Sequence, residues 1–284
     1  MKIYIFKMAL FASTLCYSRS FQCVSKISTV RNHLVLKALK SASRTKSPSC
    51  LEIEVDEFSD DLWKLTPVVE ILKDGGVGIL PTDTCYVFCC DVHSRRGVDK
   101  IFQLKQYVGR RKPLSLLCKD ISSISKHSDG VDKELFKILK KVLPGPFTFI
   151  LPANHEVPRV LLEHKKHKKT WKRREVGMRI PDNRILHEVL RQLSNPLICS
   201  SVPLELESYD SDRDDLEIWE KSAQAMLSTD PKVISDKWGH AVDFIVNSGT
   251  IELKGVSTVV NCMVRPIEVI RHGLGNVELL GLQV

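Results

Sequence analysis

The sequence has no C-x-x-C pair, no long apolar run and no acidic residue in its first 51 positions. The nine cysteines are scattered, and several lie inside apolar runs. This favours buried, reduced thiols over a zinc site or a disulfide framework. No run of about 18 or more apolar residues occurs, so we predict no membrane-spanning helix. A hydrophobic fraction of 43% and a charged fraction of 27% are typical of a globular protein.

The positive charge is concentrated at the N-terminus. The first 51 residues hold nine Lys or Arg and nine Ser; without them, 33 basic residues face 34 acidic ones, so the formal charge of +8 belongs to this leader. Net charge is therefore no argument for nucleic-acid binding by the rest of the chain. We predict that residues 1–50 are a disordered organelle transit peptide, chloroplast ahead of mitochondrion because serine is frequent, and that residues 51–284 form the folded domain. The alternatives are a disordered basic tail and a secretory signal built on residues 3–15.

Short strands alternate with helices of about ten residues, which predicts one layered α/β domain. The helix that begins at Thr66 is expected to have a polar cap with Pro67 in its first turn, and Gly75 and Gly76 end it. Further helices are predicted at 97–106, 131–143 and 183–193. Strands are predicted at 77–80, 113–118, 147–151, 175–181, 196–201, 244–246, 257–261 and 267–271.

Two charged segments read as insertions. Residues 164–174 (HKKHKKTWKRR) contain seven Lys or Arg, and residues 205–220 contain eight Asp or Glu. We expect both to be solvated loops or helix faces that partly neutralise each other.

Residues 81–86 (PTDTCY) follow a predicted buried strand. Two hydroxyls and a carboxylate then lie at the carboxyl end of that strand, where open α/β sheets bind ligands. The alternative is an ordinary polar turn.

Two further motifs carry cations. Lys105 ends a predicted helix and precedes the basic loop 109–112, which suits phosphate neutralisation or a plain surface cluster. Arg179 lies within an apolar strand, so a buried guanidinium there must meet a carboxylate, either internal or from a ligand.

The remaining motifs place hydroxyls at strand ends. The prolines of residues 144–146 fix the entry into a strand, so we assign this motif a structural role except at Thr148. Ser201 and Ser257 end or begin predicted strands, and Arg271 follows. Such hydroxyls either bind a ligand or cap a turn.

The order of these motifs resembles the YrdC/YciO family over about residues 60–281. The matching elements are PTDT-x-Y at 81–86, Lys105, PL at 113–114, PGP-x-T at 144–148, RIP at 179–181, STVV at 257–260 and R-x-G at 271–273. The resemblance implies a twisted, mostly mixed β-sheet with flanking helices and a large concave basic cavity. Details such as the longer spacing from Lys105 to Pro113 are most similar to the YciO branch.

The resemblance also implies an activity. Its synthases convert L-threonine, bicarbonate and ATP to threonylcarbamoyl-adenylate and pyrophosphate, and a separate transferase complex passes the product to adenosine in tRNA. Carried onto this chain, Thr84, Arg179 and Ser257 hold threonine. Lys105, Ser201 and Arg271 hold the phosphates of ATP, with Mg²⁺ expected and no metal-binding residue assigned.

Two departures weaken the synthase pattern. The family's K-x-R becomes Lys105-Gln106-Tyr107, and its S-x-N becomes Ser201-Val202-Pro203. Losing one charged phosphate contact and one amide contact costs several kcal/mol of transition-state stabilisation if each contact is worth roughly 1.5–3 kcal/mol.

The alternative functions are double-stranded RNA binding and a nucleotide sensor without turnover. In the RNA-binding hypothesis the basic insertion is a cationic arm on which Trp171 stacks a base. Its cations are Lys165, Lys166, Lys168, Lys169, Lys172, Arg173 and Arg174.

Overall fold

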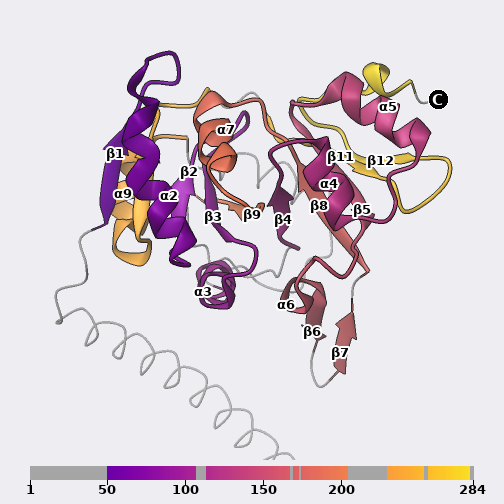
Figure 1. Ribbon diagram of the computed structural model, residues 1–284, viewed down its shortest axis with the longest axis horizontal. Helices are drawn as coiled ribbons and strands as arrows, with labels where there is room; N and C mark the ends of the chain where they lie inside the picture. The colour runs from indigo at the N-terminus through magenta and orange to yellow at the C-terminus, as the bar shows by residue number, and fades with distance from the viewer. Residues whose placement is uncertain are drawn as a thin grey trace, which may run out of the picture. The chain divides into compact units, whose positions relative to one another are not determined.

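The computed structural model describes residues 50–106, 113–166, 169–172, 174–203, 229–252 and 255–281, without the side chains of residues 105–106, 163–166 and 169–172. Within these residues, ten strands form one mixed sheet in the order β1-β10-β2-β3-β9-β4-β8-β5-β11-β12 (Figure 1). Their bounds are β1 (Leu51–Glu54), β2 (Gly78–Leu80), β3 (Val87–Asp91), β4 (Ser115–Leu117), β5 (Phe147–Pro152), β8 (Glu175–Arg179), β9 (Leu197–Ser201), β10 (Phe244–Asn247), β11 (Thr258–Asn261) and β12 (Glu268–Arg271).

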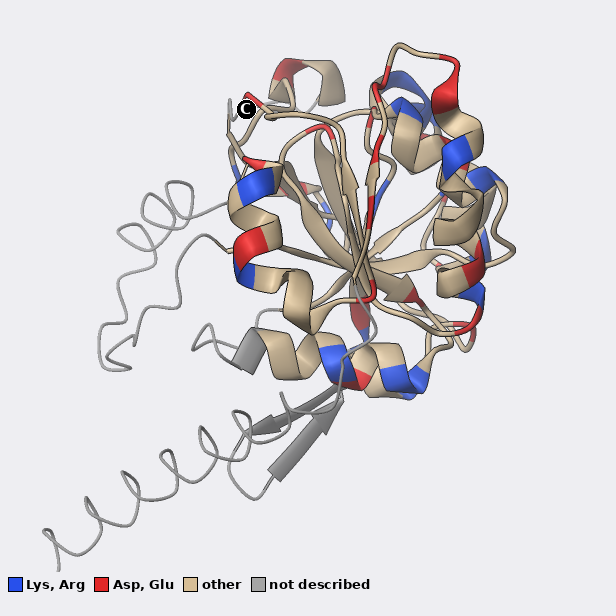
Figure 2. Ribbon diagram, turned by 90° about the vertical axis from the view of Figure 1, so that its left-hand side faces the viewer, with Lys and Arg blue, Asp and Glu red and all other residues tan. Residues whose placement is uncertain are grey.

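Successive residues of the central strands belong to two separate apolar cores, one on each face of the sheet. Ile79 and Phe88 lie in one core, and their neighbours Leu80 and Val87 lie in the other. The first core includes residues of α3 (Arg95–Gln106), α4 (Ile121–His127), α5 (Lys133–Val142) and α9 (Pro231–Trp238). The second includes residues of η1 (Asp61–Leu65), α2 (Thr66–Lys73) and α7 (Arg184–Arg191). Figure 2 shows helices on both sides of the fanned strands, as the α/β prediction requires.

Side-chain caps set the start of several helices. Asp120, Asp132 and Asn183 each accept a hydrogen bond from the backbone N–H three residues on, at 2.6, 2.7 and 2.9 Å. Such caps satisfy donors that a helix leaves open at its first turn. Asn183 therefore fixes where α7 begins, directly after the strand that carries Arg179.

The predicted polar cap of α2 is wrong. Thr66 is the first residue of the helix and Leu65 precedes it without a side-chain cap. The Thr66 hydroxyl instead donates to the carbonyl oxygen of Trp63 in η1 (2.9 Å). Burial of Val68, Val69 and Leu72 stabilises the helix.

The basic insertion is not a loop or a helix face, as expected from sequence. β6 (Glu163–Lys166) and β7 (Lys169–Lys172) pair antiparallel as a separate hairpin that follows the short α6 (Arg159–Leu162). The acidic segment 205–220 and the leader 1–49 lie outside the described residues. No described helix is long and apolar enough to span a bilayer. The seven cysteines that the structure describes are free thiols, and all except Cys50 are buried, as predicted.

Candidate functional site

The loop of residues 81–86 connects β2 to β3, which pair antiparallel. The Thr82 hydroxyl donates to the carbonyl oxygen of Cys85 (2.6 Å) and accepts from the backbone N–H of Thr84 (3.2 Å). These bonds make the loop a tight turn in which Thr84 is buried. Thr82 therefore has a structural role, and the hydroxyl of Thr84, which lies 3.2 Å from that of Thr82, also accepts a hydrogen bond from Arg179.

Arg179 is a buried cation at the end of β8. Its Nη2 donates to Oδ1 of Asp83 (3.0 Å) and to Oγ1 of Thr84 (3.1 Å). Its Nε is buried and has no hydrogen-bond partner among the described residues. The carboxylate that the sequence required is thus internal, and it comes from the same loop as Thr84.

Asp83 is held on both carboxylate oxygens, because Oδ2 accepts from the backbone N–H of Asp182 (3.1 Å). Burial raises the pKa of Asp83, and the adjacent Arg179 guanidinium opposes that rise. Groups with shifted pKa values and a specific charged partner are concentrated at functional sites. Sequence reasoning noted this carboxylate but gave it no role.

Ser201, at the end of β9, lies close to the same loop. It pairs with Val87 at the start of β3, and its hydroxyl is hydrogen-bonded to the Cys85 thiol. Burial raises the pKa of Cys85, while Arg179 and the hydrogen bonds from Ser201 and Thr84 lower it. The structure therefore brings Ser201, Thr84 and Arg179 into one neighbourhood.

Ser257 forms a second polar cluster with Thr148 and Arg271. The Ser257 hydroxyl lies 2.9 Å from Oγ1 of Thr148, and both side chains are buried. Arg271 donates through Nη2 to the backbone oxygen (2.8 Å) and hydroxyl (3.2 Å) of Ser257. Thr148 was predicted to differ from the purely structural prolines before it, and its hydrogen bond to another predicted site residue, Ser257, agrees with that prediction.

Strand register places the two clusters on one face of the sheet. Leu117 of β4 pairs with Arg179 and belongs to the core under α2 and α7. A Cβ atom at Gly177, two residues before Arg179, would lie 3.1 Å from Cγ2 of Thr148. Since alternate residues of a strand share a face, Arg179, Gly177, Thr148 and the bonded Ser257 lie side by side.

This face changes character across the sheet. On β10, β2, β3, β9 and β4 it is mostly apolar and packs against α2 and α7, with Ser201 of β9 and Ser115 of β4 as small polar exceptions. On β8, β5, β11 and β12 it carries Gly177, Thr148, Arg179 and Arg271 together with the branched apolar residues Ile150 and Val259. Glycine and short polar side chains leave room above a sheet, and arginines attract anions. This half of the face can therefore hold a small anionic or zwitterionic ligand.

The predicted phosphate-binding lysine is only partly described. Lys105 is the second-last residue of α3, and its side chain and residues 107–112 lie outside the description. Pro203, at the position where the resemblance implies an asparagine, is buried, and its carbonyl oxygen accepts from the indole Nε1 of Trp238 (3.2 Å). Position 203 therefore packs against α9.

The proposed RNA-binding cations are also only partly described. Lys168 and Arg173 lie outside the described residues. Lys165, Lys166, Lys169 and Lys172 are placed along the hairpin by their backbone alone. Arg174, at its base, is exposed.

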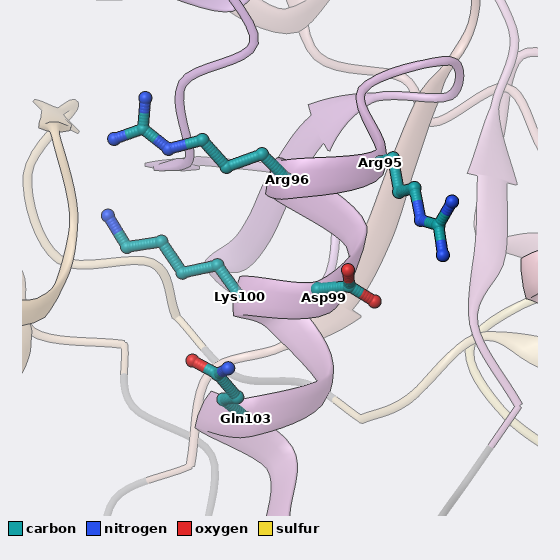
Figure 3. Close-up of a pocket in the computed structure, with 5 residues that line it drawn as sticks. All are labelled: Arg95, Arg96, Asp99, Lys100 and Gln103. Carbon is teal, nitrogen blue, oxygen red and sulfur yellow. The ribbon is translucent and has the colours of Figure 1, made fainter.

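A separate hollow of about 510 Å³ lies along α3, lined by Arg95, Arg96, Asp99, Lys100 and Gln103 (Figure 3). Lys100 forms an ion pair with Asp243 (3.2 Å). None of the predicted site residues lines this hollow. The large basic cavity expected beside Arg179 stays a prediction.

Comparisons with known proteins identify the family and the fold of the chain. The family model for Sua5, YciO and YrdC, described as telomere recombination, matches residues 70–228. The chain belongs to this family. It is 30% identical over 214 residues to the uncharacterized protein YciO of Escherichia coli K12, covering 75% of this chain and 91% of the relative. The crystal structure of E. coli YciO matches with a TM-score of 0.64 and 29% identity, covering 81% of this chain and 98% of YciO.

A second relative has a more specific name. A putative threonylcarbamoyl-AMP synthase of Methanocaldococcus jannaschii is 27% identical over 232 residues, covering 80% of this chain and 95% of the relative. The predicted family and its fold, a mixed sheet with flanking helices, are confirmed. The family thus includes threonylcarbamoyl-AMP synthases as well as uncharacterized YciO proteins.

Proposed function

We propose that the domain binds L-threonine and ATP on the polar half of the sheet face and, with bicarbonate, forms threonylcarbamoyl-AMP and pyrophosphate for tRNA modification. The observation that carries the proposal is the shared face. Thr84 and Arg179 form one hydrogen-bonded cluster, Thr148 and Ser257 form another, and register places them next to each other. Family membership supplies the reaction class.

The threonine end of the site combines a cation with hydroxyls. In the proposal, the Arg179 guanidinium meets the carboxylate of threonine, and Thr84 and Ser257 offer hydroxyls to its polar groups. Charge-assisted bonds from a planar guanidinium to a carboxylate are short and directional. Burial strengthens them because solvent screening is weak there.

The nucleotide end uses Ser201, Lys105 and Arg271. Arg271 is oriented by its bonds to Ser257, so a phosphate that meets Arg271 lies beside bound threonine. The reaction needs this proximity. Bicarbonate takes up a proton and loses water to give carbon dioxide, which the threonine amine captures as it loses a proton to solvent. An oxygen of the resulting carbamate then attacks the α-phosphate as pyrophosphate leaves.

The protein's contribution is alignment and charge neutralisation. Holding two reactants in contact replaces an unfavourable bimolecular step, and fixed cations stabilise charge on the transferred group. No nucleophilic side chain is needed. The Cys85 thiol suits this site only as a packed, protonated group, because burial raises its pKa.

The described side chains form no dedicated magnesium site, so a magnesium ion would be held mainly by the phosphates of ATP and by water. No three His, Cys, Asp or Glu side chains cluster within the described residues. Both oxygens of Asp83 are already engaged. The proposed reaction therefore uses the chain's own cations and hydroxyls to hold and align the reactants.

Pyrophosphate release tests the proposal. We expect the full-length chain to release pyrophosphate from ATP only when threonine and bicarbonate are both present. Thr84→Val, which removes the hydroxyl that Arg179 contacts, should lower this activity. Thr66→Val, whose hydroxyl contacts a backbone carbonyl in η1, is the matched control and should not. A preparation that binds ATP yet shows no dependence on threonine would eliminate the synthase.

The hairpin supports a second proposed function, binding of double-stranded RNA. The hairpin and the residues that follow it are rich in Lys and Arg, and clustered cations of this kind can bind a phosphate backbone. The two functions are compatible in one protein, since they use different residues.

We also propose that residues 1–50 direct import into the chloroplast, on the basis of their acid-free, serine-rich composition. Fusing them to a fluorescent protein in plant cells tests this. Fluorescence in mitochondria would select the alternative, and an unchanged cytosolic signal would reject import.

A further inference from the structure

Asp83 occupies a position that the proposed reaction does not by itself explain. The structure pairs it with Arg179 at 3.0 Å, and the two side chains are only 9% and 7% exposed. A buried ion pair is a costly feature, because both charges lose most of their hydration. Such a pair is weak evidence for stability, so a functional reason for its presence is worth testing.

The contacts of Arg179 are unequally distributed over its nitrogens. Nη2 makes both bonds to the loop, to Asp83 and to Thr84, whereas the buried Nε makes none among the described residues. Buried donors without partners are rare. The orientation of the guanidinium therefore does not maximise its own hydrogen bonds. It follows the position of Asp83 and Thr84.

Asp83 is itself rigidly held. Its second oxygen accepts from the backbone N–H of Asp182, the residue before the Asn183 cap of α7. One carboxylate thus connects the 81–86 loop, the end of β8 and the start of α7. A planar guanidinium binds a carboxylate best when it is oriented in advance, and a long arginine side chain needs a second group to fix it.

We propose that Asp83 is a positioning residue, which fixes the Arg179 guanidinium in the orientation that receives the carboxylate of the amino-acid substrate. The inference rests on the proposed function, since it assigns Arg179 to that carboxylate. It does not place Asp83 in contact with the substrate. When Asp83 loses its charge, the guanidinium is free to turn toward a partner for Nε, and recognition of the carboxylate weakens.

The test compares two ligands of the full-length protein by isothermal titration calorimetry. L-Threonine and L-threoninamide share the amine and the side-chain hydroxyl, but only threonine carries a carboxylate. The wild-type protein should bind threonine more tightly. Asp83→Asn should reduce this preference by about tenfold or more, since a charge-assisted bond is at stake. A merely structural role of Asp83 would weaken both ligands equally and leave the preference unchanged.

Asp132→Asn is the matched control. Asp132 also pairs with an arginine, Arg265, but both side chains are about half exposed. Asp132 is the N-cap residue of α5, and Arg265 lies between β11 and β12. This variant should keep the wild-type preference. An unchanged or larger preference in Asp83→Asn would overturn the positioning role.

A double-mutant cycle covers the case in which Asp83→Asn does not fold. Removing both partners leaves no buried charge without a counter-charge, so Asp83→Asn/Arg179→Met should fold better than the single Asp83→Asn variant. If Asp83 acts through Arg179, Asp83→Asn should not change the ligand preference in the Arg179→Met background. A further loss there would show that Asp83 acts directly and would overturn the inference. A wild-type protein without preference for threonine would refute the proposed function itself, and the inference with it.

Discussion

Replacing Arg179 by methionine should lower the free energy of unfolding, because it leaves the buried carboxylate of Asp83 without a counter-charge. Methionine keeps an unbranched apolar side chain but removes the partner of Asp83, whose side chain is 9% exposed. Breaking a buried ion pair from one side costs about 3–5 kcal/mol. Domains of this kind are stable by roughly 5–15 kcal/mol, so the variant should fold but unfold at clearly lower urea concentration near neutral pH.

The deficit should depend on pH, with a sign that the structure fixes. Burial raises the pKa of Asp83 and Arg179 lowers it, so the pKa rises further when Arg179 is lost. A carboxyl group whose pKa is raised by folding favours the folded state fully at pH values below its unfolded pKa of about 3.9. That contribution disappears as pH rises through the folded pKa. The Arg179→Met deficit should therefore grow from mildly acidic to neutral pH.

Urea unfolding of the full-length chain, followed by tryptophan fluorescence at several pH values, measures both effects. Asp83→Asn/Arg179→Met supplies the comparison, because it also removes the Asp83 carboxylate that the single variant leaves buried without a partner. It should recover most of the lost free energy of unfolding at neutral pH and show a weaker pH dependence. The reasoning is refuted if Arg179→Met is as stable as the wild type, or if the double variant is no more stable than the single one.

Three further outcomes are expected. Gly177→Ala should weaken threonine binding and cost about 1–3 kcal/mol of stability, because its methyl group would lie 2.8 Å from Oγ of Ser115 and 3.1 Å from Cγ2 of Thr148. Gly239→Ala meets only an ordinary contact and should do neither. Calorimetry and thermal unfolding measure both effects, and equal behaviour of the two variants would count against the packed site. Of the seven described thiols, Cys50 should react fastest with a thiol reagent at mildly alkaline pH in the native protein, since the others are buried. Its reaction should still be slow, because burial and the nearby Glu52 raise the pKa of Cys50 to about 11. Rapid labelling of the remaining six thiols in the folded state would contradict their burial. Neutralising the cations of residues 164–174 should weaken double-stranded RNA binding and flatten its salt dependence without lowering pyrophosphate release, and a salt-independent affinity of the wild type would exclude the cationic arm.

Most of the fold was predictable because its signals are local. The four predicted helices exist, and Asn183 begins α7 as its cap, since amphipathic spacing and capping act within a few residues. The predicted strands also exist, with ends that differ by a few residues. β3 was missed because its first four residues, VFCC, are all buried and show no alternation of apolar and polar side chains. The β6–β7 hairpin was missed because a run of Lys and Arg resembles a solvated loop.

The site was harder to predict, because its contacts join distant segments. Sequence indicated that Arg179 needs a carboxylate, but nothing local identified Asp83, which is 96 residues away. Thr148 was singled out without a partner, and only the pairing of β5 with β11 brings it to Ser257. Strand order in a mixed sheet is set by the whole core, so no window of sequence contains it.

The two ends of the proposed site differ in how fully this chain keeps the family pattern. At the threonine end, Thr84, Arg179 and Ser257 are all present and bonded within one face. At the nucleotide end, Gln106-Tyr107 lacks the family's arginine, and position 203 is a buried proline whose carbonyl serves Trp238. Proline has no amide group that could donate to ATP. Because Pro203 is buried against α9, we expect that replacing it by asparagine alone would not restore this contact. The proposed site therefore keeps its amino-acid half more completely than its phosphate half, and we expect threonine recognition to be better preserved than the efficiency of its activation.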